Sequence, residues 1–156
     1  MDHRVLRDGH RALADTPCPF EKAIATRLCG CQHAAKTQIA EREAIRCTVA
    51  DAQDVCVQLL MLLVENGTFA LRQTGTPAAL PHAKALKIQC GGLLGLQRAL
   101  DPYEESPRVN NIFGLVKRAL LRYKDLPSFP FAEIVREVST YSARRSRNTR
   151  SGSGSE

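Results

Sequence analysis

Six cysteines give this chain its clearest potential for chemistry. They are Cys18, Cys29, Cys31, Cys47, Cys56 and Cys90. No two of them have a CxxC spacing, so the common signature of zinc sites and of thioredoxin-like redox sites is absent. Thiolates bind zinc and iron–sulfur clusters and also act as nucleophiles. The cysteines therefore indicate metal binding, redox chemistry or core packing, and their placement must decide among these.

The expected heights of the cysteines along a helical bundle favour one shared site. Consecutive helices joined by short loops run antiparallel, and each residue advances about 1.5 Å along a helix. On this arrangement Cys18 and Cys47 fall together at one end, and the other four cysteines fall into a separate band. These four are Cys29, Cys31, Cys56 and Cys90. Converging thiols of this number are the ligands of a tetrathiolate zinc ion or an iron–sulfur cluster.

We therefore predict that these four thiols bind an iron–sulfur cluster, with zinc as the alternative cofactor and Cys18 and Cys47 as substitute ligands. Cys18, Cys31 and Cys47 each precede or open an expected helix, where free N–H groups and the helix dipole favour the thiolate. An iron–sulfur site indicates electron transfer, or a redox-linked accessory role beside a larger protein.

A glycine pair follows one of the predicted ligands. In the stretch KIQCGGLLGLQ, Gly91 and Gly92 come directly after Cys90. Each glycine costs a helix about 1 kcal/mol relative to alanine, so some contact must compensate. We predict that Gly91 and Gly92 let the backbone approach the cofactor closely. The alternative is a close helix crossing on a small-residue face formed by Gly92, Gly95 and Ala99.

Other interpretations of the cysteines stay open. Cysteine is among the most often buried residue types, and Cys56 lies on an apolar stripe, so the thiols could simply pack a core. Cys29 and Cys31, in the sequence CGC, could form a strained and reducible disulfide, which would make the protein a thiol oxidoreductase. His33 or His82 could supply a further metal ligand.

Length and composition favour one soluble domain. The 156 residues are enough for a hydrophobic core, and 44% hydrophobic with 24% charged residues is near the globular average. The longest apolar run, residues 55–64, is ten residues long, whereas a membrane span needs about 20. Residues 1–17 lack the apolar region of a secretory signal. We expect a cytoplasmic protein without membrane contact, whose thiols are kept reduced.

Apolar periodicity predicts an all-α fold, an irregular bundle of five or six helices. The expected helices cover residues 18–28, 32–46, 48–73, 81–99, 109–123 and 131–142. No segment shows a convincing strand pattern. Residues 1–16 are expected to form a flexible arm, residues 17–142 a single helical domain, and residues 143–156 a disordered basic tail of Arg, Ser and Gly.

The tail supports a second function class. It holds four Arg and one Glu, which is half of the net charge of +6. The alternative to a metal protein is thus a helical interaction module, with structural cysteines and a tail that contacts an acidic partner or nucleic acid. The tail has no aromatic residue for base stacking. No phosphate loop, nucleophile elbow or paired carboxylates are present, so the sequence favours a non-enzymatic role.

Overall fold

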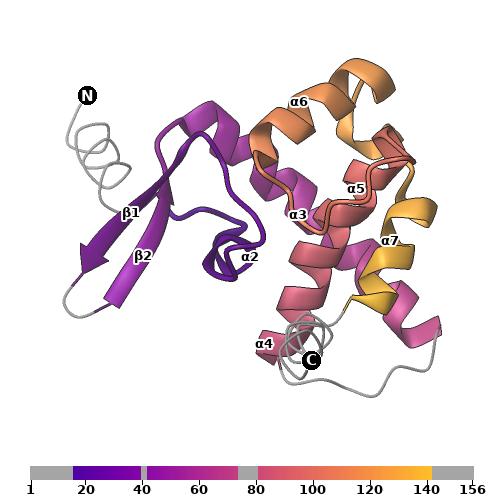
Figure 1. Cartoon of the computed structure of the whole chain (residues 1–156), viewed down its shortest axis with the longest axis horizontal. Helices are drawn as coiled ribbons and strands as arrows, with labels where there is room; N and C mark the ends of the chain where they lie inside the picture. Colours follow the sequence, from indigo (N-terminus) through magenta and orange to yellow (C-terminus); the bar gives the residue numbers. More distant parts are fainter. Residues whose placement is uncertain (1–15, 40–41, 74–80, 142–156) are drawn as a thin grey trace, which may run out of the picture.

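The computed structural model describes residues 16–39, 42–73 and 81–141 (Figure 1). The predicted arm, residues 1–16, lies outside these ranges except for Thr16, and the predicted tail, residues 143–156, lies outside them entirely. Within the described residues a two-stranded hairpin stands at one end, and the helices pack together beside it.

Helices make up most of the described chain, so the mainly helical fold predicted from the periodicity is confirmed. In chain order they are α2 (Glu21–Ala25), α3 (Ala50–Gln73), α4 (Pro81–Leu86), the π-helical turn η1 (Lys87–Gly91), α5 (Gly92–Leu100), α6 (Ile112–Tyr123), the 3₁₀ turn η2 (Leu126–Ser128) and α7 (Phe131–Thr140). The core lies between α3, α5 and α7, where Leu59, Leu63, Leu93, Ile134 and Val138 are at most 1% exposed.

The predicted helix over residues 32–46 is wrong. This segment forms an antiparallel hairpin, β1 (Ala34–Ile39) and β2 (Arg42–Cys47), with Ala34 paired to Cys47. The segment is rich in helix formers, but among its described side chains the strongly buried ones are Ile45 and Cys47, two residues apart, as on one face of a strand. Tertiary contacts therefore override the helix propensity of this segment, because its apolar side chains can be buried on one face of a strand.

The small-residue face of α5 makes a close helix crossing. A Cβ atom added at Gly91 would lie 2.7 Å from Val138 Cα on α7, and one added at Gly95 would clash with the backbone of Ile134. At Gly92 it would lie 2.9 Å from Leu63 Cδ1 on α3. Protein atoms of α7 and α3 thus fill the space beside Gly91 and Gly92 where we predicted a cofactor. The close helix crossing compensates for the low helix propensity of the glycines.

The helix α3 is unusual for its apolar length. Among the described residues it is the one helix, over 50–72, that is long and apolar enough to cross a membrane by length and composition alone. The core helix of a soluble protein passes the same test. The ten-residue apolar run at 55–64 does not reveal this property, because α3 extends beyond the run at both ends.

Candidate metal centre

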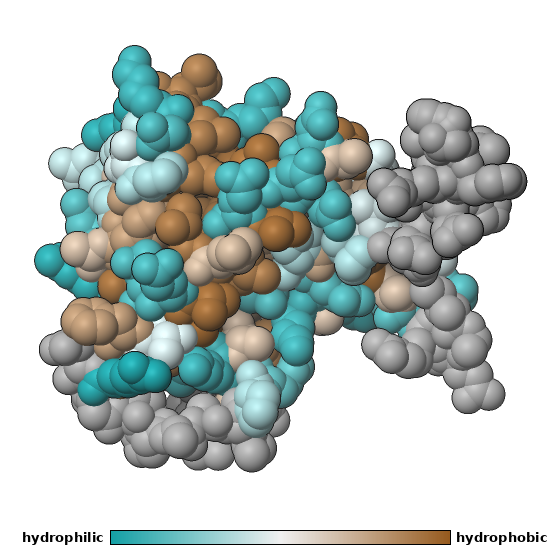
Figure 2. All heavy atoms as spheres, turned by 180° about the vertical axis from the view of Figure 1, so that it is seen from behind, coloured by the Kyte–Doolittle hydropathy of each residue, from teal (hydrophilic) through white to brown (hydrophobic). Residues whose placement is uncertain are grey.

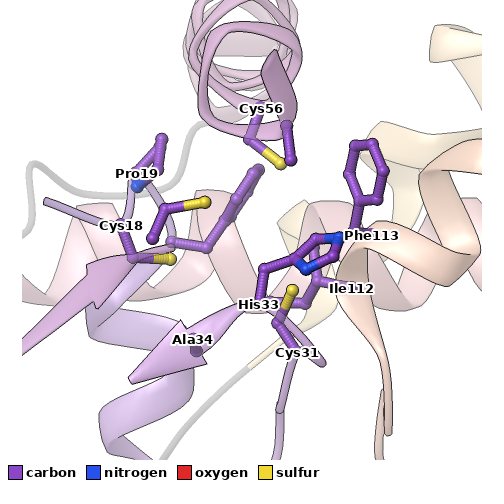
Figure 3. A pocket seen from close by; sticks show the side chains of 11 residues that line it. Cys18, Pro19, Cys31, His33, Ala34, Cys56, Ile112 and Phe113 are labelled. Carbon is purple, nitrogen blue, oxygen red and sulfur yellow. The ribbon is translucent and has the colours of Figure 1, made fainter. Parts of the chain in front are cut away.

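The structure divides the predicted four-cysteine set between two places. Cys31 and Cys56 line one small pocket, whereas Cys29 and Cys90 hydrogen-bond to each other in the helical core. The two substitute ligands of the sequence prediction complete the pocket (Figure 3). The four-thiol pocket, as we call it, therefore contains Cys18, Cys31, Cys47 and Cys56.

Each thiol of the four-thiol pocket comes from a different part of the chain. Cys18 precedes α2, and Cys31 lies in the loop between α2 and β1. Cys47 is the last residue of β2, and Cys56 lies in the second turn of α3. The hairpin brings two of them together, because it returns the chain from Cys31 to Cys47 at the same end of the sheet.

Backbone hydrogen bonds fix the segment that carries Cys18. Cys18 N donates to Ile45 O at 3.0 Å, and Cys47 N donates to Thr16 O at 2.8 Å. Pro17 thereby forms a β-bridge alongside β2. The first turn of α3 is tied to the same segment, since Gln53 Nε2 donates to the carbonyl of Pro17 at 3.0 Å. The positions of Cys18 and Cys47 are thus set by backbone pairing.

The loop that carries Cys31 is held from two sides. Thr48 donates both its backbone N–H and its hydroxyl to His33 O, each at 2.9 Å, which joins this loop to the residue after Cys47. From α6, Asn111 Nδ2 donates to Gln32 Oε1 at 2.6 Å, and Gln32 N donates to Asn111 Oδ1 at 3.1 Å. These bonds preorganise the loop before any ligand binds.

The four-thiol pocket is small and has an apolar rim. Its volume is about 10 Å³, which is close to that of one water-sized sphere. Phe20, Ala52, Ile112 and Phe113 contribute to its walls. His33 also lines it, with its ring centroid 5.2 Å from that of Phe113. Figure 3 shows the labelled thiols and the His33 ring around this one space.

The thiols of the pocket influence one another's ionisation. Burial, followed by repulsion from the thiolate forms of Cys31, Cys18 and Cys47, raises the pKa of Cys56 to about 12. Burial is also the main cause that raises the pKa of Cys18 to about 11, and the thiolate forms of Cys31 and Cys47 add to it. Without a cation the pocket therefore favours neutral thiols, and a bound cation would remove this mutual repulsion.

The side chains as placed do not form a finished coordination sphere. Over residues 16–39, 42–73 and 81–141, no three His, Cys, Asp or Glu side chains are grouped so that they could hold a metal ion. Cys47 Sγ instead donates to Val49 O at 3.2 Å. Metal binding would require the Cys47 side chain to leave this carbonyl and the four sulfurs to turn inward.

Cys29 and Cys90 form a separate buried pair. Cys29 forms a β-bridge with Val109 on the loop before α6, and Cys90 lies in the π-helical turn η1. They are 7% and 1% exposed. The adjacent Gln89 accepts a hydrogen bond from Ala23 N at 3.1 Å, so this turn is fastened to α2. A π-helical turn often marks a functional position, but here it also carries a structural contact.

Ionisation within this pair is strongly asymmetric. The hydrogen bond to Cys90 and burial raise the pKa of Cys29. The same hydrogen bond, with smaller contributions from Tyr141 and Thr26, lowers the pKa of Cys90 to about 7, although burial opposes this. Cys90 is thus the member of the pair that ionises first, but two sulfurs alone do not make a tetrathiolate site.

The remaining predicted ligand contributes nothing to either cysteine group. His82 is exposed in the first turn of α4, and it lines neither the four-thiol pocket nor the contacts of the Cys29 and Cys90 pair. The alternation of Ile45 and Cys47 in β2 is a weak strand signal in the sequence, and the hairpin that contains it brings Cys31 and Cys47 together. Comparison of the chain with protein-family models, curated proteins and solved structures gave no match.

Proposed function

We propose that this is a metal-binding protein in which Cys18, Cys31, Cys47 and Cys56 hold a single structural metal ion, with zinc as the preferred ion. The observation that carries the proposal is the convergence of four thiols from four segments on one pocket. Zinc sites closed by four cysteines are structural, because no coordination position is left for a substrate.

The size of the pocket favours a single ion over an iron–sulfur cluster. A space of about 10 Å³ matches one atom-sized occupant. A cluster contains several iron and sulfide atoms and would require the walls formed by Phe20 and Ile112 to move apart. An iron–sulfur cluster with a redox role beside a larger protein is therefore the second candidate, and the same experiment distinguishes it.

The hairpin beside the pocket is the part of the fold that a bound ion would stabilise. A two-stranded hairpin is at best marginally stable in water on its own. This hairpin has Ile45 and Cys47 as its strongly buried side chains. A metal ion bound by Cys31 and Cys47 would fasten both ends of the hairpin, and Cys56 would attach it to α3. Metal-binding free energy would then act as folding free energy for residues 16–49.

Metal analysis of the full chain, purified without air, tests the proposal. We expect one zinc per chain, and after exchange with Co²⁺ the near-ultraviolet charge-transfer bands of thiolate coordination together with intense visible d–d bands of a tetrahedral site. The double variant Cys18→Ala with Cys56→Ala should retain less than a tenth of the metal. The matched control, Cys29→Ala with Cys90→Ala, removes two buried thiols outside the pocket and should retain it all.

Three outcomes would count against zinc in this pocket. A brown protein with several iron and sulfide ions per chain would favour the cluster. A protein that never binds zinc, even when folded with excess metal, would leave the thiols as core residues. Loss of zinc from the control pair instead would move the site to Cys29 and Cys90. Circular dichroism of each variant separates loss of ligands from loss of fold.

A further inference from the structure

A groove lies between the C-terminal half of α3 and α7. Its volume is about 440 Å³, within the range of about 300–1,000 Å³ that is typical of small-molecule sites. Residues between 66 and 70 of α3 and between 131 and 139 of α7 line it. On α7 the spacing of Ala132, Val135, Arg136 and Ser139 places these residues on one face of the helix. We call this space the α3–α7 groove, and its described lining shares no residue with the four-thiol pocket.

Apolar side chains form most of the walls of the α3–α7 groove. Phe69 lines it from α3 although its side chain is 62% exposed, and Phe131, which is 9% exposed, lines it from α7. Figure 2, which views the molecule from behind, shows apolar side chains that reach the surface of the helical part among hydrophilic ones. An apolar group that covered the Phe69 ring would remove it from water. The groove therefore favours an occupant with an apolar body.

Polar groups line the groove where the two helices approach each other. A Cβ atom added at Gly67 would lie 3.5 Å from Val138 Cγ1, so α3 and α7 are close at these residues. Asn66 and Ser139 are their neighbours in the sequence, and both line the groove. The Ser139 hydroxyl donates to Val135 O at a long 3.4 Å. It can therefore turn to a ligand at little cost.

Arg136 adds a positive charge to the lining of the groove. Its side chain is exposed on α7, and among the described residues it forms no ion pair. The next residue, Glu137, is paired with Arg98 Nη1 at 2.6 Å. A guanidinium group binds a carboxylate through two parallel hydrogen bonds. The charge of the groove is therefore complementary to an anion, and a carboxylate fits its donor geometry.

The size of the groove favours a small molecule over a protein. Eight residues line it, whereas a stable protein interface uses about 20–30 residues on each side. From Ala132 to Ser139 the α7 face extends about 10 Å, which suits a medium-chain alkyl group. We propose that the α3–α7 groove binds a medium-chain alkyl carboxylate, with the carboxylate at Arg136 and Ser139 and the chain against Phe69 and Phe131.

Titration of the full chain with three matched probes tests the proposal. Octanoate should bind saturably to one site with a Kd of about 1 mM or tighter, as measured by calorimetry. The alcohol 1-octanol has the same chain without the charge and should bind at least about fivefold more weakly. Acetate has the charge without the chain and should not bind measurably. Amide NMR shifts on adding octanoate should be confined to residues 66–70 and 131–139.

Substitutions in the groove and on α6 locate the site. Arg136→Gln should weaken octanoate binding at least about fivefold and leave 1-octanol binding unchanged. Ala132→Trp, at an exposed position, should fill the groove and abolish binding of both probes. The matched controls Arg118→Gln and Leu121→Ala change exposed side chains of α6 and should bind octanoate as the wild type does.

Several results would overturn the proposal. They are a lack of saturable octanoate binding, 1-octanol binding as tight as that of octanoate, and NMR shifts centred on α6. Wild-type affinity in Arg136→Gln, or in an Ala132→Trp variant that circular dichroism shows to be folded, would do the same. None of these results depends on whether the four-thiol pocket holds a metal, so the two proposals fail separately.

Discussion

The two groups of cysteines overlap in burial but differ in what surrounds them, since Cys47 and Cys56 are about as buried as Cys29 while Cys18 and Cys31 are half-buried. The four-thiol pocket is formed by two loop segments, the end of β2 and the second turn of α3, and its four cysteines line one small space. The pair Cys29 and Cys90 lies among helices, and each sulfur has the other as its partner. Burial alone therefore does not distinguish a ligand from a core residue. The number of converging thiols and the space between them do.

The two cysteine groups also differ in the contacts that hold the surrounding backbone in place. The backbone around Cys18 and Cys47 is fixed by hydrogen bonds, but few apolar side chains hold the hairpin in place. Cys90 sits beside Leu93, which is fully buried, and its turn is packed against α7. We therefore expect the pocket region to depend on a bound ion for stability, whereas hydrophobic burial alone can stabilise the helical region.

The largest expected effect is the response of these two regions to a chelator. Removing the metal should lower the hydrogen-exchange protection of β1 and β2 by at least about 100-fold, which corresponds to about 2.7 kcal/mol. Protection in α5 and α7 should change little, because their core does not involve the pocket. Exchange measured by mass spectrometry, with and without added zinc, checks this. Equal loss in both regions would show that they unfold as one unit.

A smaller effect is expected from the buried pair. Cys90→Ala removes a sulfur that is 1% exposed and should destabilise the protein by about 1–2 kcal/mol through the cavity it leaves. The bound metal should remain at one ion per chain. Urea unfolding gives the first quantity and elemental analysis the second. If Cys90→Ala released the metal, the separation of the two cysteine groups would be wrong.

Alkaline pH should separate the metal-free from the metal-loaded protein. Cys18 and Cys56 have folded-state pKa values of about 11 and about 12, above the ordinary value of 9.0. Their neutral thiols contribute stability that is fully present below about pH 9 and is lost as pH rises through 11 to 12, because the unfolded chain releases these protons first. In the loaded protein the ligands are already thiolates, so this loss should be reduced.

Thermal unfolding between pH 8 and pH 11, in both states, measures the difference. Cys90 provides an internal contrast, since its hydrogen bond with Cys29 lowers its pKa, so its thiolate should form in the folded metal-free protein at lower pH than those of Cys18 and Cys56. A titration of thiolate absorbance in the far ultraviolet should show this early step, and Cys90→Ala should remove it. Identical alkaline profiles with and without metal would argue against thiolate ligands.

The helical part of the fold could be predicted because its sequence signals are strong. The predicted helix over residues 131–142 is observed as α7, Phe131–Thr140, which begins directly after Pro130. The apolar residues Ile112, Leu115, Val116 and Ala119 are buried in α6 as their spacing predicts. In both helices the apolar stripe is continuous, so the period itself identifies the structure.

The grouping of the cysteines could not be predicted by the same route. The expected helix over residues 32–46 would have moved the chain about 22 Å away from Cys31 before reaching Cys47. The hairpin instead brings Cys47 back to the start of β1, where it pairs with Ala34. One incorrect element thus changed the position of every later cysteine. The strand structure of this segment depends on the burial of Ile45 in the folded protein, and local propensity does not predict such a contact.

The smallest effect that should still separate the two groups involves Thr48. Its hydroxyl donates to His33 O at 2.9 Å and helps join the Cys31 loop to Cys47. Thr48→Val keeps the shape but removes this hydrogen bond, at a cost of about 1 kcal/mol, and zinc affinity should fall up to about tenfold because the ligands are less well positioned. Competition with a chromophoric chelator measures the affinity.

Thr140→Val is the matched control for this change. Thr140 Oγ1 donates to Arg136 O at 3.3 Å on α7, far along the chain from the pocket ligands and in an equally exposed setting. We expect this variant to bind zinc as tightly as the wild type. Equal affinities for Thr48→Val and Thr140→Val would mean that the Thr48 hydroxyl does not help to position the Cys31 loop. The backbone N–H of residue 48 and the contacts of Gln32 with Asn111 would then be sufficient to hold the loop.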